Sequence, residues 1–294
     1  MKFLIAVGSK KYSEPTLRVG MQVAKAFGAS VTILYVGPKV SAFSSSQVRL
    51  ARESMDRWEI EHPGVEVLEW AFNFLAENNY ITPKMIEAGF QKNTLVTTRG
   101  DRCELFLQGA VCEDVNLILR NGDIIPELRD EVAKGKYNVT IIGGSKKRRM
   151  AHDLVQYINS SIFIVKEFNH EIGYRLLMAT DDSTGTKKAV KFGARVSQAF
   201  DMPIDILTVS KKSFFGSGYR EASKKASTLI RRAGIDGEVQ LKVGDPVDVI
   251  VESAGQDHII VMGASTANPV KKFFIGSKPL KVMSDCECPI LIVK

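Results

Sequence analysis

The chain has 294 residues, of which 45% are hydrophobic and 25% charged, and its formal net charge is +7. This composition excludes a disordered chain, a collagen and a coiled-coil rod, and at about 150 residues per domain the length suggests two domains. The basic residues are spread along the chain, so we interpret the charge as a solvated surface and expect no specific nucleic-acid partner.

Neither the cysteines nor the apolar runs point outside the cytoplasm. No stretch approaches the roughly 20 apolar residues that span a bilayer, so we expect no membrane partner. Cys103, Cys112, Cys286 and Cys288 have neither the density of a disulfide scaffold nor the spacing of a zinc site. We therefore expect reduced thiols in a cytoplasmic protein.

The chain contains an internal repeat. Residues 3–36 align without a gap with residues 176–209. Each copy opens on a short apolar run, Phe3–Val7 or Leu176–Ala179, which is typical of a strand buried on both faces. Helical spacing follows, and Val31–Val36 and Ile204–Val209 then predict second strands.

The repeat resumes further along the chain. Its later matches join a Gly-Asp turn before a helix, an apolar strand ending in Gly-x-Ser, and a last apolar strand. They are Asn121–Ile124 with Val243–Pro246, Val139–Ser145 with Ile259–Ser265, and Ser161–Lys166 with Pro289–Lys294. Each copy thus predicts strand-helix-strand-helix-strand-helix-strand, an α/β fold with a mostly parallel sheet.

The two copies differ in length. Copy one has a long stretch, Gly37–Val115, where copy two has one short helix at about Tyr219–Arg232. This stretch includes a helix-like segment, Val65–Asn78, and a strand-like segment, Thr94–Val111. We place an insertion around residues 40–113 and predict two domains, residues 1–168 and 169–294, joined near Glu167–Gly173.

Polar and glycine-rich segments follow the predicted strands of copy two. In an open α/β sheet, ligands bind at the carboxyl ends of the strands. Thr180-Asp181-Asp182-Ser183 ends the first strand and Val209 ends the second. A later strand runs into Gly263-Ala264-Ser265-Thr266, and nine residues on stands Gly276-Ser277.

This spacing resembles the universal stress protein family, whose phosphate-binding pattern is Gly, two residues, Gly, nine residues, Gly, then Ser or Thr. Thr266 replaces the second glycine of the pattern. Thr180–Ser183 is similar to the family's first-strand turn. The resemblance covers nearly all of residues 174–294 and the framework of copy one.

The resemblance implies two tandem universal stress protein domains, each Rossmann-type and similar to the adenine nucleotide alpha hydrolases, with mostly parallel sheets flanked by helices. It implies a stress-response regulator, not an enzyme, that binds ATP or another adenine nucleotide, with or without Mg²⁺, in its C-terminal domain. Single-domain relatives dimerise through the last strand, so Phe163–Val165 and Leu291–Val293 are expected to pair within one chain as a pseudo-dimer. A homodimer and an unidentified protein partner are left open.

Residue roles also follow from the resemblance. Asp181 is expected at the ribose hydroxyls or in a metal-linked network, and the Val209 backbone at the adenine edge. Glycines at 263 and 276 let backbone N–H groups approach phosphate oxygens, and Ser277 can donate a hydrogen bond. The remaining members of the expected nucleotide site line the pocket or its loop: Ala179, Thr180, Met262, Ala264, Ser265 and Thr266.

Structural alternatives stand beside these roles. Asp181 can simply cap the helix that follows it, Gly263 can close a strand, and Gly276-Ser277 can form a turn and N-cap. Pro279, which cannot donate a hydrogen bond, stands where the family often has a hydroxyl. A nucleotide-free interaction protein that uses the insertion, and a slow ATPase that uses Asp181, are the alternative functions.

Copy one lacks the chemistry of copy two. Gly8 stands at the position of Asp181, and no Gly-Ser pair matches Gly276-Ser277. Lys146–Arg149 either attracts phosphate or is a solvated run of charge. We expect no ATP in copy one, and we expect His258, which opens an apolar strand, to be structural.

Overall fold

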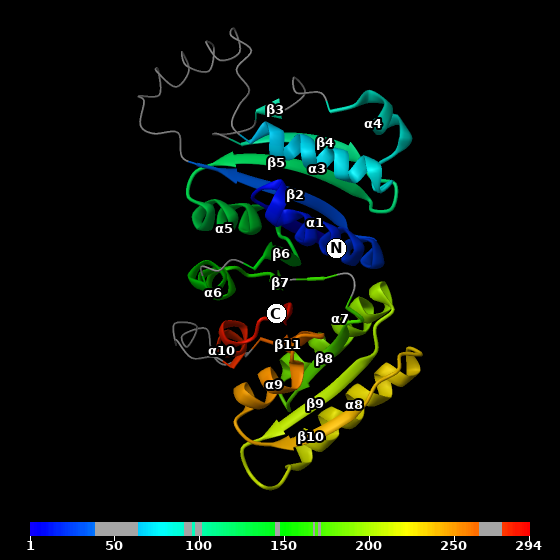
Figure 1. Cartoon of the computed structure of the whole chain (residues 1–294), viewed down its shortest axis with the longest axis vertical. Coiled ribbons are helices and arrows are strands. Elements are labelled where there is room, and N and C mark those ends of the chain that lie inside the picture. Colours follow the sequence, from blue (N-terminus) through cyan, green and yellow to red (C-terminus); the bar gives the residue numbers. More distant parts are fainter. Residues whose placement is uncertain are drawn as a thin grey trace.

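The computed structural model describes residues 1–38, 64–90, 96–97, 102–144, 148–166, 168–169, 172–264 and 278–294. Within them, helices and strands alternate twice over, as the repeat predicts (Figure 1). The first half contains β1 (Lys2–Val7), α1 (Lys10–Phe27), β2 (Ser30–Gly37), α3 (Val65–Glu77), α4 (Pro83–Ala88), β3 (Val96–Thr97), β4 (Cys103–Gln108), β5 (Asp114–Asn121), α5 (Ile124–Gly135), β6 (Val139–Gly143), α6 (Arg148–Tyr157) and β7 (Ser161–Val165). The second half contains β8 (Arg175–Thr180), α7 (Thr184–Phe200), β9 (Ile204–Ser210), α8 (Ser217–Arg232), β10 (Val239–Val243), α9 (Pro246–Ala254), β11 (His258–Gly263), α10 (Lys278–Asp285) and β12 (Ile290–Val293).

All these strands form one sheet, in the order β10-β9-β8-β11-β12-β7-β6-β1-β2-β5-β4-β3. The second half runs β10-β9-β8-β11-β12 and the first half runs β5-β2-β1-β6-β7, which is the same order by position in each repeat. Every pair inside these two sets is parallel. The predicted α/β class and mostly parallel sheet are therefore confirmed.

Each half has one strand more than the repeat predicts. β5 and β10 directly precede the two Gly-Asp turns. In both strands polar residues interrupt the apolar ones, as in Val239-Gln240-Leu241-Lys242-Val243. They therefore lack the continuous apolar run that marks the buried strands.

The two halves meet in the middle of the sheet. β7 and β12 pair antiparallel, with Phe163 opposite Leu291 and Ile164 opposite Ile290. The predicted contact between the two last strands is thus confirmed, and the sheet runs unbroken from one half to the other. The predicted boundary at residues 168 and 169 falls between β7 and β8 and stays a prediction.

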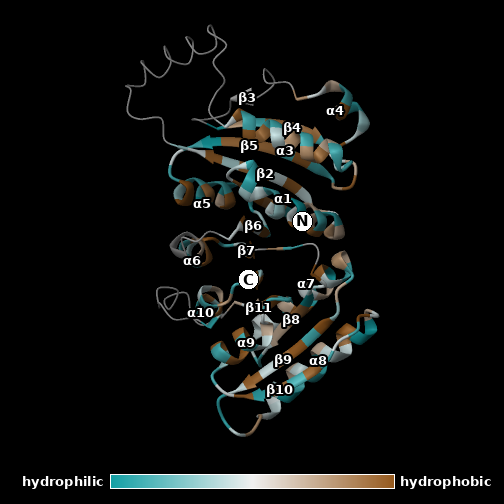
Figure 2. Cartoon of the chain, in the orientation of Figure 1, coloured by the Kyte–Doolittle hydropathy of each residue, from teal (hydrophilic) through white to brown (hydrophobic). Residues whose placement is uncertain are grey.

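Helices cover both faces of the sheet. Residues of α1, α3, α7 and α8 share one hydrophobic cluster, on what we call the α7 face, and residues of α5, α6, α9 and α10 share the other, on the α9 face. The rings of Phe27 and Phe192 lie 4.5 Å apart where α1 meets α7, so the core continues across the halves. Figure 2 shows brown, hydrophobic colour along much of the sheet and a mixture of teal and brown on the helices.

The insertion extends the sheet beyond β5. β4 pairs antiparallel with β5, and β3 with β4. α3 confirms the helix predicted at Val65–Asn78, and β3 and β4 lie within the strand-like stretch Thr94–Val111. α3 follows the second strand of its half as α8 does in the other, so the extra elements are α4, β3 and β4. Residues 39–63 of the insertion lie outside the described residues.

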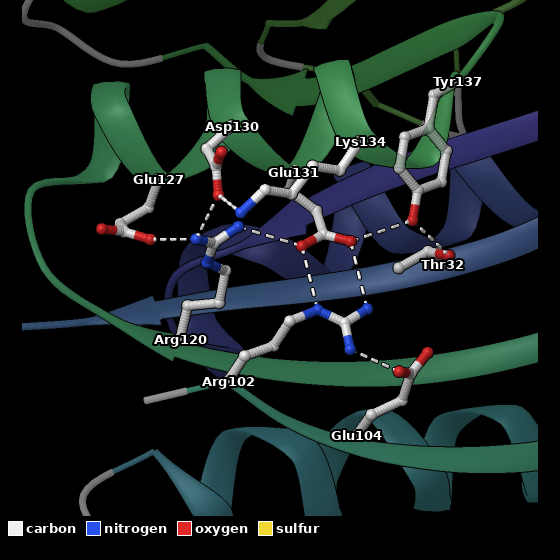
Figure 3. A network of polar contacts seen from close by, with 9 residues as sticks. All are labelled: Thr32, Arg102, Glu104, Arg120, Glu127, Asp130, Glu131, Lys134 and Tyr137. Atoms are coloured by element: carbon white, nitrogen blue, oxygen red, sulfur yellow. Dashed lines mark hydrogen bonds and ion pairs between the residues drawn. The ribbon is translucent and has the colours of Figure 1, made fainter. Parts of the chain in front are cut away.

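Charged side chains tie β4 to α5 (Figure 3). Glu131 of α5 is 3% exposed and accepts hydrogen bonds from Arg102 Nε at 3.1 Å and Arg120 Nη1 at 3.0 Å. Arg102 also pairs with Glu104 of β4. Burial alone would lower the pKa of Arg102, but its hydrogen bonds to Glu131 and Glu104 outweigh burial and raise it. Two guanidinium groups therefore share one buried carboxylate.

Candidate functional site

The strand order of the second half reverses between β8 and β11. β9 lies on one side of β8 and β11 on the other. The connections that follow β8 and β11 pass over opposite faces, α7 on one and α10 on the other. Such a reversal opens a crevice at the carboxyl ends of the two strands, where open α/β sheets bind their ligands. The first half has the same reversal between β1 and β6.

Small apolar residues line this edge on the α9 face. Ala179 of β8 and Met262 of β11 are register partners on neighbouring strands. Ala179 also pairs with Leu207 of β9, and Val209 lies two residues further along that strand. With Ala264, these expected pocket residues belong to one hydrophobic cluster, in which Ala179 and Ala264 are only half-buried. The structure thus brings the side chains expected around the base to one place.

Thr180 is turned away from the other expected pocket residues. Side chains alternate along a strand, so Thr180 faces the α7 side while Ala179 faces the α9 side. Its Oγ1 lies 2.6 Å from Oγ1 of buried Thr208, its register partner on β9. Only the backbone of Thr180 is therefore at the edge on the α9 face, and its expected role as a lining side chain does not fit this geometry.

Asp181 links the end of β8 to the start of α7. Its Oδ1 accepts hydrogen bonds from Ser183 N at 3.0 Å and Thr186 Oγ1 at 2.7 Å, and its own N–H donates to Thr186 Oγ1 at 3.1 Å. Burial alone would raise the pKa of Asp181, but the hydrogen bonds from Ser183 and Thr186, with the charge of Lys278, lower it. The carboxylate is therefore ionised at neutral pH, and it has the structural role that sequence reasoning offered as the alternative.

Gly263 allows α7 to approach the end of β11. A Cβ on Gly263 would lie 2.5 Å from the carbonyl carbon of Gly185, and a Cβ on Gly185 would lie 2.7 Å from the carbonyl oxygen of Ala264. Two glycines thus let two backbones cross at the reversal point. The N–H of Ala264 donates to Val293 O at 2.7 Å, so this group is already used by the sheet.

The loop after Ala264 lies outside the description. Ser265, Thr266, Gly276 and Ser277 are not among the described residues, so their expected roles stay predictions. α10 begins directly after them at Lys278, whose charge acts on Asp181. The loop is therefore closed at its far end by a helix that starts near the same carboxylate.

Residues of α8 join the site from the α7 face. A cavity of about 400 Å³ lies between α7 and α8 beside Asp181, Asp182 and Ser183, with Gly218 and Lys187 in its lining. Burial raises the pKa of Tyr219, and the negative charges of Asp182 and Asp181 raise it further. Sequence reasoning missed α8 as a neighbour of Asp181, because only the fold brings the two together.

The first half keeps the backbone bonds of this edge without its carboxylate. Ser13 occupies the position of Thr186, and its Oγ accepts from Gly8 N at 2.7 Å and Ser9 N at 3.2 Å. Gly144 N donates to Val165 O at 2.7 Å, as Ala264 N does to Val293 O. Gly8 supplies no acid where Asp181 stands. Lys146 and Lys147 are outside the described residues.

Other candidate chemistry is sparse in the described part of the chain. His258 lies at the opposite, amino edge of β11, where its ring nitrogens contact Asp257 at 2.8 Å and Asp205 at 3.4 Å, a structural setting. The described residues contain no group of three or more His, Cys, Asp or Glu side chains that could hold a metal ion. No helix among them is long and apolar enough to cross a membrane.

Comparison with known proteins agrees with this geometry. Residues 174–294 match the model of the Universal stress protein family. The chain belongs to the universal stress protein family. A universal stress protein of Synechocystis is 26% identical over 197 residues, which cover 63% of this chain and 67% of the relative.

Solved structures extend the likeness of this universal stress protein to its full length. A universal stress protein from Archaeoglobus fulgidus covers 100% of this chain and 96% of its own, with 16% identity and a TM-score of 0.53. A functionally unknown protein from Pseudomonas aeruginosa covers 100% and 92%, with 12% identity and a TM-score of 0.60. At these identities the likeness shows the fold, in the first half as in the second.

Proposed function

We propose that this universal stress protein binds an adenine nucleotide, ATP or a relative of it, at the carboxyl edge of β8 and β11. The observation that carries the proposal is the half-buried floor of Ala179 and Ala264 at the reversal point, beside the ionised carboxylate of Asp181. A flat base needs small apolar neighbours, and a ribose needs a hydrogen-bond acceptor. Both are present at one strand edge.

Each part of the nucleotide has a proposed partner in this arrangement. The base would lie on Ala179 and Met262, with the Val209 backbone at its polar edge. The ribose hydroxyls would donate to Asp181. The phosphates would be held by Gly276 and Ser277, immediately before α10, where a helix N-terminus favours an anion. Mg²⁺, where it accompanies the nucleotide, would be held by the phosphates and Asp181.

We propose that the chain works as a binder and regulator and not as an enzyme. Asp181, the acid of this site, is engaged by Ser183 and Thr186 at the start of α7. A bound nucleotide would therefore act on α7 and on the loop before α10, and so change a surface that a partner protein reads. The four cysteines are all free and buried, which agrees with a reducing, cytoplasmic setting.

A second candidate function is protein interaction through the insertion. Phe106 of β4 is 62% exposed on the strand that the insertion adds to the sheet. A large apolar side chain on an added edge is a feature of interaction surfaces. This function needs no nucleotide, so it is separated from the first by direct measurement of binding.

The experiment compares the two halves of one chain. Mass spectrometry of the purified protein would show a co-purified nucleotide, and calorimetric titration with ATP and AMP would give the affinity. Ala179→Leu should fill the floor and weaken binding at least tenfold. Ala6→Leu, the same change at the aligned and similarly half-buried position of the first half, should leave the affinity unchanged.

Two outcomes would count against nucleotide binding in the second half. One is the absence of both co-purified nucleotide and binding heat in the unmodified protein. The other is equal loss of binding in Ala179→Leu and Ala6→Leu. A phosphate-release assay with ATP tests the further proposal that the chain is not an ATPase, which steady turnover that Asp181→Ala abolishes would contradict.

A further inference from the structure

β10 forms an open edge of the sheet in the described part of the chain. β9 lies on one side of it, and its other side ends the strand order (Figure 1). Val239 is the register partner of Ile206, and Ile206 N donates to Glu238 O at 2.8 Å. In a parallel ladder, bonded residues alternate. Residues 238, 240 and 242 therefore face β9, and the N–H and C=O groups of Val239, Leu241 and Val243 point outward.

The same outward residues carry exposed apolar side chains. Val239 is 48% exposed, Leu241 46% and Val243 53%. Natural edge strands are usually blunted by proline, a bulge or an inward-pointing charge. β10 has none of these, because its single charged residue, Lys242, donates to Ser253 Oγ of its own α9 at 2.9 Å. Both the backbone and one row of side chains are thus prepared to pair with another strand.

The strand is complementary to itself in one register. Antiparallel pairing centred on Leu241 sets Val239 opposite Val243 of the partner subunit, and every outward N–H and C=O group then has a partner. On the other side of the strand, Gln240 comes opposite Lys242 of the partner subunit, so no like charges oppose each other. A shift of centre by one residue would set Lys242 against itself and turn the bonding groups away.

We propose that a second copy of this chain pairs with β10, antiparallel and centred on Leu241, to give a homodimer with a continuous sheet. This contact lies at the far end of the sheet from the insertion and apart from the β7–β12 junction inside the chain. It is independent of nucleotide binding. A foreign strand would satisfy the backbone equally well, but the self-matching register favours a copy of the same chain.

Charge on α8 opposes the dimer and gives it a measurable salt dependence. Arg220, Lys224 and Arg231 are exposed on α8, which covers the same face of the sheet as the Val239 row. Two copies would bring two such helices toward the dyad. Salt screens this repulsion and strengthens apolar contact, so the dimer should tighten as ionic strength rises.

Sedimentation equilibrium of the full chain tests the proposal. We expect a monomer–dimer equilibrium, and at least a tenfold weakening in Leu241→Pro. Proline removes the outward N–H, which the strand's own ladder does not use, so the fold should tolerate it at this edge. Leu241→Val, which keeps the N–H and an apolar side chain, should keep the dimer. A chain that stays monomeric, or a dimer unchanged in a folded Leu241→Pro, overturns the proposal.

Cross-linking tests the register and does not depend on the proline variant. Bonded antiparallel partners have Cα atoms about 5.5 Å apart, within reach of a disulfide, so Leu241→Cys should cross-link to its own copy on oxidation. Val239→Cys should not, because its copies lie about 13 Å apart along the strands. An equimolar mixture of Val239→Cys and Val243→Cys should cross-link. Equal cross-linking in Leu241→Cys and Val239→Cys alone, or none in any sample, overturns the register.

Discussion

Lys166 and Lys294 make the same contact in opposite directions across the middle of the sheet. Lys166 follows β7 of the first half, and its Nζ donates to the carbonyl oxygens of Met283 at 2.6 Å and Cys286 at 2.8 Å, at the end of α10. Lys294 follows β12, and its Nζ donates to Val155 O at 2.6 Å and to Ile158 O, at the end of α6. Each half thus supplies a cation to the carboxyl end of a helix in the other, where the helix dipole favours it.

The first prediction concerns Lys166. Lys166→Met keeps the aliphatic stem and removes the charge, and so leaves the carbonyls of Met283 and Cys286 without their donor. Hydrogen bonds to a charged group contribute about 1.5–3 kcal/mol, so the free energy of unfolding should fall by about that amount. Urea denaturation at neutral pH measures it. Lys134→Met is the control, because Lys134 is 70% exposed in a surface pair and should cost under about 0.5 kcal/mol. Equal costs for the two variants would contradict the assigned role.

The second prediction concerns Gly263. Gly263→Ala places a methyl group against the backbone of Gly185, which cannot move aside as a flexible side chain can. Overpacking of this kind costs about 1–3 kcal/mol. Gly173→Ala is the matched control, because a Cβ there meets nothing within 4 Å, and it should be neutral or slightly stabilising. Thermal unfolding followed by circular dichroism compares the two. A neutral Gly263→Ala would mean that α7 and β11 do not cross as closely as described.

Repeated apolar runs made the fold predictable from the sequence, and the same signal hid part of it. Buried strands such as Ile259–Gly263 and Ile290–Val293 are continuous apolar segments, and their order within each copy determines the parallel sheet. β5 and β10 escaped because polar residues interrupt them. The Ala179–Met262 floor follows from strand register, so the sequence could place it. The contact of Gly263 with Gly185 depends on how a helix crosses a strand, which spacing alone does not encode.

The third prediction concerns the network in Figure 3. Glu131→Gln removes the carboxylate that Arg102 and Arg120 share and leaves two half-buried guanidinium groups short of a partner. Breaking a buried ion pair from one side costs about 3–5 kcal/mol. We expect that loss in urea denaturation, with β4 detaching first because Arg102 immediately precedes it.

Asp130→Asn is the comparison for this network. Asp130 also pairs with Arg120 at 2.6 Å, but its side chain is 40% exposed, so its loss should cost under about 1 kcal/mol. Hydrogen exchange, read along β4 and β5, locates the effect. If the amides of β4 stay as protected in Glu131→Gln as in the unmodified chain, the network does not anchor the insertion.

The fourth prediction is a pH dependence that arises from Asp181. Hydrogen bonds and the charge of Lys278 lower the pKa of Asp181 below its ordinary value despite burial. A carboxyl group with a lowered pKa in the folded state stabilises the fold above its unfolded pKa, about 3.9, and this contribution is lost as pH falls through the lower, folded value. Asp181→Ala should therefore cost about 1 kcal/mol at pH 7, as the loss of a helix-capping acid does, and progressively less below about pH 4.

Denaturant unfolding between pH 7 and pH 3 measures this convergence of the two stability curves. Asp236→Ala is the control, because it removes an exposed carboxylate at the amino end of β10, away from α7, and should leave the pH dependence unchanged. A difference between Asp181→Ala and the unmodified chain that stays constant down to pH 3 would show that the side chain acts by packing and not by its charge. In that case Asp181 would also lose the physical reason for accepting hydrogen bonds from a ribose, because the ionised acceptor is what both roles require.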